Sequence, residues 1–568
     1  MSTTSKPLGQ LLKDQKIIGE EHICFAVHEQ KITGEKLGEI LVRLGFVTEY
    51  DIAVAVADQA GVPYLDVEGL LPPEEVLSLF NKSLCLKHIF LPIGTNKGLI
   101  HVASPEVSNP ELNQLITRHC SLKPTFYLSE KTKTVNAINK LYYFAENPIE
   151  SLIEKEVKLL SQDVEGARDL DKLVRYIMEL AVKMRATDIH IRPIERSTNI
   201  SFRIDGVLTS VLSLPPELLR VVSLIKTKAE MDIAEQRLPQ DGGFSTEILN
   251  GTYDVRVSTI VSPQGENLVL RLLPKENSVV GLHQLGFLED DIETVKRMFN
   301  EPYGIVLITG PTGSGKSTTL YAGVRTLNLL KKNVVTVEDP IEYKIPLLRQ
   351  TQVNEKAGYT FAGAIRHFLR HDPDVILVGE VRDSDTAATA VSASATGHLV
   401  LSTLHTNDAV GAIPRLRDLG VNPFMLADSL VGVMSQRLVR KICTNCKGPY
   451  NPSPREKVYL GDPSIQVLYK GKGCNVCQGT GYFGRTLVYE ILVVNHNLAR
   501  LISQKADPGL IAQRARKEGF ADIFSVAALK AKQGVTTTEE IKRNLGQIRQ
   551  AQPEAGHDMK PISQVRAV

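Results

Sequence analysis

The sequence predicts a multidomain protein of the α/β class, and three observations carry that prediction. The chain has 568 residues, which is long enough for three or four domains rather than one. Short apolar runs, among them residues 301–310 and 397–405, are followed by segments with helical spacing, as in α/β folds. Residues 7–30 and 36–59 repeat one pattern, which indicates a separate module at the start of the chain.

The repeat predicts two helix-turn-helix units. In each copy, apolar residues fall at helical spacing on both sides of a short break. The matching positions are Leu8 and Leu37, Gly9 and Gly38, Leu12 and Leu41, Ile23 and Ile52, and Gln30 and Gln59. Residues 61–140 mix helical and strand patterns, so they are expected to form a small α/β part.

A charged stretch and four strands predict a second α/β domain. Residues 146–168 open with Asn-Pro and are rich in charge, which indicates a linker or an exposed helix at a domain boundary. Alternation of apolar and polar residues then predicts strands with one buried and one solvated face, with Arg203 and Arg256 on the solvated side. These strands are expected at residues 187–194, 199–206, 252–260 and 266–273.

Composition narrows the class of protein. The net charge of +2 argues against a strongly basic nucleic-acid surface. No run of about 18 apolar residues is present, so no membrane span is expected. The start of the chain, MSTTSKPLGQ, lacks the apolar core of a signal peptide. We therefore expect a cytoplasmic protein that can still dock on a membrane.

Residues 310–318, GPTGSGKST, fit a phosphate-binding loop between a strand and a helix. Glycines let backbone N–H groups point at phosphate, Lys316 is expected to reach the outer phosphates, and the Ser317 hydroxyl is expected to hold Mg²⁺. The flanking strand and helix argue against the alternative, a chance glycine-rich turn. The predicted nucleotide-binding residues are Gly310, Pro311, Thr312, Gly313, Ser314, Gly315, Lys316, Ser317 and Thr318.

Acidic residues at the ends of two further strands are expected near this loop. Glu380 follows the strand DVILVG, where a carboxylate can orient Mg²⁺ or act as a base toward water. An ordinary solvated acid is the alternative. Glu338, Asp339 and Glu342 come at and after the end of another strand, NVVTV.

Histidines and arginines complete the candidate catalytic set. His398 and His405 flank the strand LVLSTL, where they either sense the phosphate or pack structurally. Planar guanidinium groups suit the charge on phosphoryl oxygens, although each arginine taken alone is more typical of a surface ion pair. The candidates are Arg366 and Arg370, which share a helix face, and Arg256 and Arg271, which lie on strands of the preceding domain.

Four of the seven cysteines form two CxxC pairs, which favour a metal site in a cytosolic chain. Four thiolates give a closed tetrahedral zinc site, so a structural role is expected. A redox pair is the alternative, and zinc modules also occur in nucleic-acid proteins. The predicted ligands are Cys443, Cys446, Cys474 and Cys477.

The stretches TVEDPIEY, DPDVILVGEVRD and TGHLVLSTLHTN, taken with the phosphate loop, resemble the ordered motifs of the secretion ATPase superfamily. Its members power type II secretion and type IV pilus assembly. RIDGVL and LPQDGGF resemble the N2 domain that precedes the motor core in that family. The resemblance covers about residues 170–545. It implies a PAS-like α/β N2 domain, a RecA-like P-loop core and a hexamer.

The same resemblance implies roles for several candidates. Glu380 would be the catalytic acid, and Arg256 and Arg271 would reach the phosphates from N2. Arg366 and Arg370 would support the site or a neighbouring subunit. The four-cysteine insert and the long N-terminal region resemble those of extension and secretion ATPases, whereas retraction ATPases generally lack both.

The N-terminal repeat resembles a cyclic-di-GMP-binding module. The second copy keeps most of that pattern, with Lys36 in place of an arginine. The first copy has Pro7 in place of that arginine and Lys16 in place of a glycine. The repeat is therefore expected either to bind cyclic-di-GMP or to dock a membrane partner. The candidate residues for the dinucleotide are Leu8, Gly9, Gln30, Lys36, Leu37, Gly38 and Gln59.

Together these features predict a hexameric cytoplasmic motor, peripheral at the inner membrane, that hydrolyses ATP to add pilin subunits through an inner-membrane platform protein. A type II secretion motor is the nearest alternative, and a DNA-transport ATPase or a non-catalytic scaffold are further ones. No nucleic-acid partner and no direct membrane insertion are expected. The predicted division is an N-terminal domain (1–145), a linker (146–168), N2 (169–278), the ATPase core (279–550) with the zinc insert (440–480), and a mobile tail (551–568).

Overall fold

The computed structural model describes residues 6–107, 109–162, 169–275 and 280–546. The chain divides into two compact units. Of the described residues, unit 1 holds those from Glu49 to Asn277, and unit 2 combines Lys6–Thr48 with those beyond Ser278. The predicted tail and the end of the predicted linker lie outside the described residues. No described helix is both long and apolar enough to cross a bilayer.

The tandem repeat forms four helices, which confirms the two helix-turn-helix units. They are α1 (Leu8–Asp14), α2 (Glu20–Thr33), α3 (Leu37–Arg43) and α4 (Glu49–Ala60). The first three pack with the core, because Arg325 donates hydrogen bonds to the carbonyl oxygens of Gly45 at 3.1 Å and Val47 at 2.5 Å. Residues 6–48 thus group with unit 2 rather than with the rest of the predicted segment 1–145, and that domain division stays a prediction.

Unit 1 begins with a small α/β part, as expected from residues 61–140. Strands β1 and β2 pair antiparallel, and β2 and β3 pair parallel. Buried apolar side chains from the sheet and from four helices form one cluster. The elements are α5 (Glu74–Leu77), α6 (Lys82–His88), β1 (Leu91–Asn96), β2 (Leu99–Ser104), α7 (Pro110–Cys120), β3 (Lys123–Leu128) and α8 (Lys131–Glu146).

The second part of unit 1 is an antiparallel sheet of order β6-β5-β4-β9-β8-β7. The four predicted strands are present, whereas β6 and β7 were not predicted; β7 has alternating exposure but few apolar residues to mark it. Its elements are α9 (Ile149–Ser161), α10 (Asp171–Lys183), β4 (Ala186–Ile194), β5 (Ser197–Ile204), β6 (Val207–Leu214), η1 (Pro216–Arg220), α11 (Val221–Lys228), β7 (Gln240–Ile248), β8 (Gly251–Ser262) and β9 (Gly265–Pro274).

Helix α9 occupies most of the predicted linker, and it is more than a linker or an exposed helix. Ile149, Ile153 and Leu160 recur at helical spacing and are buried in the same cluster as the sheet residues. One face of this charged helix is therefore part of the hydrophobic core, and only the opposite face is solvated.

Unit 2 is built on a seven-stranded sheet of order β12-β11-β13-β14-β10-β15-β18. All neighbouring strands pair parallel except β15 and β18, which pair antiparallel. The four predicted core strands are present. The strands are β10 (Gly304–Thr309), β11 (Val334–Glu338), β12 (Arg349–Gln352), β13 (Val375–Val378), β14 (Leu399–Leu404), β15 (Leu430–Ile442) and β18 (Tyr482–Val493).

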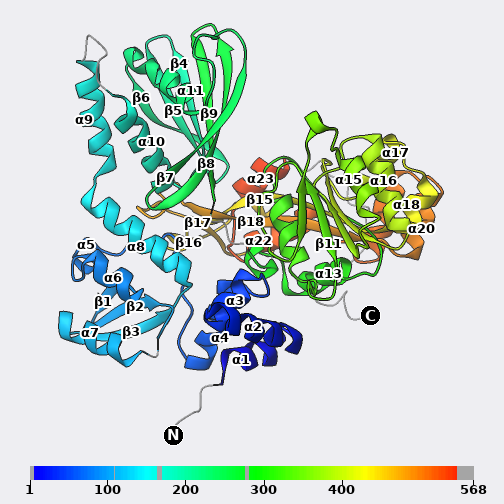
Figure 1. Ribbon diagram of the computed structural model, residues 1–568, viewed down its shortest axis with the longest axis horizontal. Coiled ribbons are helices and arrows are strands. Elements are labelled where there is room, and N and C mark those ends of the chain that lie inside the picture. Colours follow the sequence, from blue (N-terminus) through cyan, green and yellow to red (C-terminus); the bar gives the residue numbers. More distant parts are fainter. Residues whose placement is uncertain (1–5, 108, 163–168, 276–279, 547–568) are drawn as a thin grey trace. The chain divides into compact units, whose positions relative to one another are not determined.

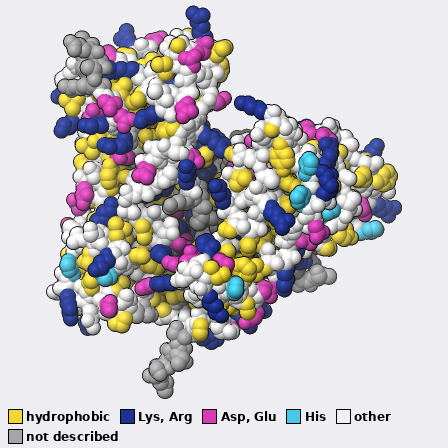
Figure 2. All heavy atoms as spheres, viewed as in Figure 1, with side chains coloured by type: hydrophobic (Ala, Val, Ile, Leu, Met, Phe, Trp, Pro, Cys, Tyr) yellow, Lys and Arg dark blue, Asp and Glu magenta, His cyan; other side chains and the backbone are white. Residues whose placement is uncertain are grey.

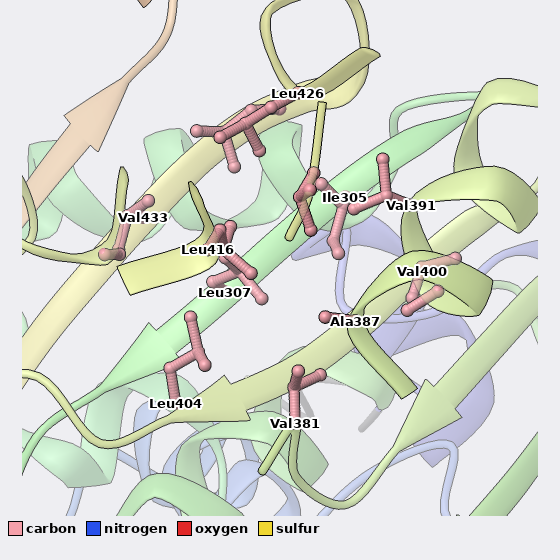
Figure 3. Packing of buried hydrophobic residues seen from close by; sticks show 14 of the residues in the cluster. Ile305, Leu307, Val381, Ala387, Val391, Val400, Leu404, Leu416, Leu426 and Val433 are labelled. Carbon is pink, nitrogen blue, oxygen red and sulfur yellow. The ribbon is translucent and has the colours of Figure 1, made fainter. Parts of the chain in front are cut away.

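Helices cover both faces of this sheet, which explains why its central strands are apolar throughout. One face packs against α15–α18, α20 and α21, and Figure 3 shows part of this cluster around Ile305 and Leu307. The other face packs against α12–α14. Figure 1 shows α15, α16, α17 and α18 grouped together. The bounds are α12 (Leu282–Leu285), α13 (Glu289–Phe299), α14 (Lys316–Val324), η2 (Glu355–Ala357), α15 (Phe361–Phe368), α16 (Ser384–Ala395), α17 (Ala412–Asp418), α18 (Pro423–Ser429), α20 (His496–Ser503) and α21 (Pro508–Lys517).

The four-cysteine insert lies between β15 and β18 and has its own small sheet. Strands β16 and β17 pair antiparallel, and a separate cluster of apolar residues joins the insert to the last helices of the chain. The elements are β16 (Lys447–Tyr450), α19 (Pro454–Tyr459), β17 (Leu468–Gly471), α22 (Ile523–Lys532) and α23 (Thr538–Leu545).

Candidate nucleotide and metal sites

The loop between β10 and α14 requires glycine for two different reasons. Gly313 and Gly315 adopt positive φ values of 75° and 88°, which L-residues with side chains rarely adopt. Gly310 also has a positive φ, and a Cβ there would lie 2.4 Å from the Gln436 carbonyl oxygen. The turn can therefore keep its backbone close to β15 while its N–H groups surround the space before α14, an arrangement suited to phosphate.

Lys316 lies at the first position of α14 within this cradle. Its Nζ donates hydrogen bonds to the carbonyl oxygens of Gly310 at 3.0 Å and Pro311 at 3.2 Å. Burial lowers the pKa of Lys316, and the charges of Glu380 and Glu342 oppose that shift. Both carboxylates thus act on this lysine, although they follow two other strands, β11 and β13.

The hydroxyls of the cradle fit a polar ligand. Within the described part of the chain, Ser314 Oγ is buried without a hydrogen-bond partner. An orphaned polar atom in a native site calls for a ligand or water. The nine predicted nucleotide-binding residues, 310–318, form this loop and the first turn of α14, so the structure brings them together as expected.

Glu380 follows β13 and lies beside the cradle. Its side chain is 15% exposed and forms an ion pair with Arg382. His405 follows β14, and its Nε2 lies 3.5 Å from Glu380 Oε2. The carboxyl ends of parallel strands meet at one edge of a sheet, and this edge collects Glu380, His405 and the phosphate loop.

Glu338 is held in a different way. It is buried, and its carboxylate accepts hydrogen bonds from Thr336 Oγ1 at 2.6 Å, from Gln350 Nε2 at 3.2 Å and from the Tyr321 hydroxyl. Those donors connect the end of β11 to α14, so Glu338 braces the phosphate-binding helix.

The structure does not bring His398 to the cradle. It precedes β14, whereas His405 follows the six residues of that strand. At about 3.3 Å per residue, the two histidines lie about 23 Å apart, at opposite edges of the sheet. His398 Nδ1 instead lies 3.0 Å from the Ala393 carbonyl oxygen, where it contacts the end of α16. A phosphate sensor at His398 is therefore not supported.

Arg366 and Arg370 contact other residues on the outside of unit 2. Arg366 forms an ion pair with Asp385 at the start of α16, and both side chains are more than half exposed. Arg370 Nη2 lies 2.8 Å from His367 Nδ1. Arg366 therefore matches the surface ion-pair alternative, whereas Arg370 lies beyond the end of α15 and does not share a face of that helix with Arg366.

Arg256 and Arg271 lie opposite each other on β8 and β9 of unit 1. The row continues through Asp188 on β4 to Arg203 on β5. Arg271 Nε donates to Asp188 Oδ1 at 2.9 Å, and Arg203 Nε lies 3.7 Å from Asp188 Oδ2. Asp188 is thus flanked by Arg203 and Arg271, and Arg256 continues the row on β8.

Three residues of the site were not predicted from the sequence. Gln436 on β15 donates from Nε2 to the Ser314 carbonyl oxygen at 2.8 Å, Arg382 pairs with Glu380, and Tyr321 contacts Glu338. The contact between Arg382 and Glu380 could have been found from the sequence, because the two residues are only two apart. The contacts of Gln436 and Tyr321 could not, since they depend on which strands and helices are neighbours.

The four predicted cysteine ligands meet in one cluster. Their Sγ atoms lie within 4.8 Å of one another, with separations of 3.8, 3.8 and 3.7 Å for three pairs. A tetrahedron with Zn–S bonds of about 2.3 Å has sulfur atoms about 3.8 Å apart. A redox pair needs only two thiols, so the meeting of all four favours the metal site. Cys477 Sγ also accepts the Gly481 N–H at 3.2 Å, as metal-bound thiolates often do.

The repeat residues expected to contact a dinucleotide fall into both units. Leu8, Gly9, Gln30, Lys36, Leu37 and Gly38 lie on or beside α1–α3 in unit 2, whereas Gln59 lies on α4 in unit 1. A Cβ on Gly9 would lie 3.4 Å from Ile23 and 3.5 Å from Leu37, so Gly9 lets these helices pack closely. Lys16, with φ of 59°, takes the left-handed conformation that Gly45 takes in the second copy.

A mixed, mainly parallel sheet with a glycine-rich loop before its phosphate-binding helix, and with Glu380 after β13, two strands away from β10, defines a RecA-like P-loop ATPase core. The family model described as type II/IV secretion system protein matches residues 163–543. The chain therefore belongs to this family of secretion and pilus motor ATPases. A second family model, the MshEN domain, matches residues 60–148, after most of the tandem repeat.

Relatives match over nearly the whole chain. A type II secretion system protein E from Xanthomonas campestris is 36% identical over 94% of this chain and 97% of its own length. A type IV pilus assembly ATPase PilB from Thermus thermophilus is 38% identical over 90% of this chain, but the match spans 59% of the relative's own length. A crystal structure of the pilus retraction motor PilT with bound ADP is 28% identical over 65% of this chain and 96% of its own, with a TM-score of 0.46.

Proposed function

We propose that this protein is a homohexameric motor that hydrolyses Mg²⁺-bound ATP to drive the polymerisation of pilin subunits. The observation that carries the catalytic part is the meeting of Lys316, Glu380 and His405 at one edge of the sheet. Lys316 supplies positive charge for the outer phosphates, and Ser317 is the residue that would hold Mg²⁺. Glu380 would take the proton of the attacking water, and Glu342 would act through its charge.

The mechanical part of the proposal rests on the row that contains Arg256 and Arg271. These arginines lie on the solvated face of a rigid sheet in unit 1, so they are available to an anion on another unit or another subunit. Closure of that face on the γ-phosphate would move the whole sheet and would turn hydrolysis into motion. The side chains of Arg366 and Arg370 are also exposed to solvent, and we assign them to contacts between subunits.

The filament that the motor assembles is assigned from the relatives of this chain. Both PilB ATPases and type II secretion proteins resemble this chain over about nine tenths of its length. We propose pilus extension through an inner-membrane platform protein, from a cytoplasmic position peripheral to that membrane. Assembly of a type II secretion pseudopilus is the second candidate, because the Xanthomonas relative matches from end to end.

Two further ligands belong to the proposal. Zinc at the four-cysteine cluster would hold the insert together, and its four sulfur ligands would leave no open position for catalysis. Cyclic-di-GMP at the N-terminal repeat would regulate the motor. Basic and acidic side chains are interspersed on the face seen in Figure 2, and no nucleic-acid partner is proposed.

The variant Glu380→Gln of the full chain tests the catalytic assignment. We expect turnover to fall at least about a hundredfold, because the general base is lost, while binding of a fluorescent ATP analogue stays near the wild-type level. Glu301→Gln is the matched control. Glu301 is an exposed acid that precedes the start of β10, whereas the phosphate loop follows the end of that strand. Hydrolysis at the wild-type rate in Glu380→Gln would overturn the assignment.

A strain that lacks the gene distinguishes pilus extension from type II secretion. Loss of surface pili with normal protein export supports pilus extension, whereas loss of export with normal pili supports type II secretion. Stimulation of the purified ATPase by DNA would argue against both.

A further inference from the structure

Glu490 on β18 is a buried acid that the proposed mechanism does not use. The residue is 4% exposed. Its Oε1 accepts a hydrogen bond from the Ala409 backbone N–H at 2.6 Å, and its Oε2 accepts one from the Ile523 backbone N–H at 2.9 Å. Ala409 belongs to the loop after β14, and Ile523 is the first residue of α22. One carboxylate therefore connects two segments that are distant in the sequence.

The strand register places this acid close to the nucleotide loop. Thr309, the last residue of β10, pairs with Leu404 of β14 and with Ser435 of β15. Ser435 in turn pairs with Glu490. Paired residues of neighbouring strands direct their side chains to the same face, so these four form one row across the sheet. The phosphate loop begins just beyond Thr309, and His405 comes directly after Leu404.

The loop that carries His405 is held at both ends. At its start, the Val381 N–H donates to the Thr403 carbonyl oxygen at 3.0 Å. Figure 3 shows Val381 and Leu404 in one hydrophobic cluster. At its other end, Ala409 is fully buried and its N–H is bound by Glu490. His405 lies between these two anchors, and its distance to Glu380 depends on both.

We propose that Glu490 is a positioning residue for ATP hydrolysis, because its bond to Ala409 holds the loop that places His405 beside Glu380. The inference rests on the proposed role of Glu380. A buried backbone N–H without an acceptor is costly, so loss of Glu490 would make the loop rearrange to satisfy Ala409. His405, four residues earlier, would then leave its position.

The electrostatics of Glu490 agree with a role in activity. Burial raises the pKa of this carboxyl to about 7; the N–H groups of Ala409 and Ile523 oppose the shift, while Asp408 and Asp522 add to it. An apolar side chain of similar size would avoid the desolvation of a charge. Such a side chain would leave the N–H groups of Ala409 and Ile523 without their acceptor, so the acid holds two distant segments together despite its own desolvation.

A double-mutant cycle on the full chain tests the proposal. In Glu490→Gln, the amide oxygen can accept one N–H, but the amide NH₂ group faces the other donor. We expect kcat for ATP to fall about tenfold, as for a misplaced catalytic group, while KM changes less than about twofold. In a His405→Ala background, Glu490→Gln should lower kcat no further, because the group that Glu490 positions is already absent.

The matched control is Glu540→Gln, a buried acid on α23 that accepts hydrogen bonds from Arg440 rather than from the loop after β14. Any effect of that control on kcat should be the same with and without His405. The proposal is overturned if Glu490→Gln lowers kcat equally in both backgrounds, or if His405→Ala alone hydrolyses ATP at the wild-type rate.

Two further variants distinguish a failure of the positioning role from a failure of the proposed function. If Glu490→Gln does not fold, Glu490→Asp goes through the same cycle, because its shorter carboxylate cannot reach both N–H donors. Loss of turnover in Glu380→Gln together with an effect of Glu490 that is independent of His405 overturns only the positioning role. Full turnover in Glu380→Gln overturns the proposed function itself.

Discussion

Gln436 holds the phosphate loop from the neighbouring strand: its Nε2 donates a 2.8 Å hydrogen bond to the Ser314 carbonyl oxygen. The same residue's carbonyl oxygen leaves no room for a Cβ on Gly310. The shape of the cradle is thus set from β15 as well as by the loop itself.

Replacement of Gln436 by alanine should loosen the loop. The Ser314 carbonyl oxygen would lose its donor while still buried, which typically costs about 1–3 kcal/mol of unfolding free energy. We expect weaker binding of ATP and ADP by several-fold and a lower Tm, measured by fluorescence titration and calorimetry. Gln466→Ala, in the exposed part of the zinc insert, is the control. Wild-type affinity in Gln436→Ala would show that the loop keeps its shape without this bond.

Gly310 and Gly358 offer a matched pair for the loop backbone. Both have positive φ, but a Cβ on Gly310 would lie 2.4 Å from a backbone oxygen, whereas one on Gly358 has open space around it. Gly358→Ala should therefore cost only about 1 kcal/mol of stability and keep its ATPase activity. Gly310→Ala should lose nucleotide binding, and equal effects of the two variants would contradict the steric argument.

The four-cysteine cluster predicts one zinc ion per chain. Metal analysis of the purified protein should find a stoichiometry of about one, falling toward zero in Cys474→Ser, because a closed structural site needs all four thiolates. Since metal binding stabilises the fold, a strong chelator should also lower the Tm. Cys24→Ser, which changes an exposed cysteine, should keep the metal. A metal-free wild-type protein with an unchanged Tm would exclude the site.

Glu490 predicts a specific dependence of stability on pH. Burial raises its pKa to about 7, above the usual value of about 4.3 that applies in the unfolded chain. Between these values the folded state binds more protons, so the contribution of this group is present below the unfolded pKa and is lost as pH rises through 7. Glu490→Gln cannot titrate. Wild type should therefore lose stability relative to the variant, by up to a few kcal/mol, as pH rises from 5 to 8.

Denaturant unfolding of both proteins at several pH values measures this difference. A constant difference between wild type and Glu490→Gln across the range would mean that the carboxyl titrates normally in the folded state.

Local residue patterns were enough to predict several parts of this protein. The loop GPTGSGKST, the apolar strands before it and before Glu380, the paired cysteines and the two helix-turn-helix units were all predicted. Each follows from residue spacing or from the conformational demands of glycine, which neighbours along the chain are enough to reveal.

Which of these residues meet depends on how the strands and helices pack. The pattern around LVLSTL treats His398 and His405 alike, but the length of a strand separates them, and only His405 reaches Glu380. Arg325 binds the carbonyl oxygens of Gly45 and Val47, so the first three helices pack with the ATPase core. Gln436 and Glu490 gain their contacts from the order of β10, β15 and β18. Such contacts join residues far apart in the chain, and a sequence pattern contains no record of strand order.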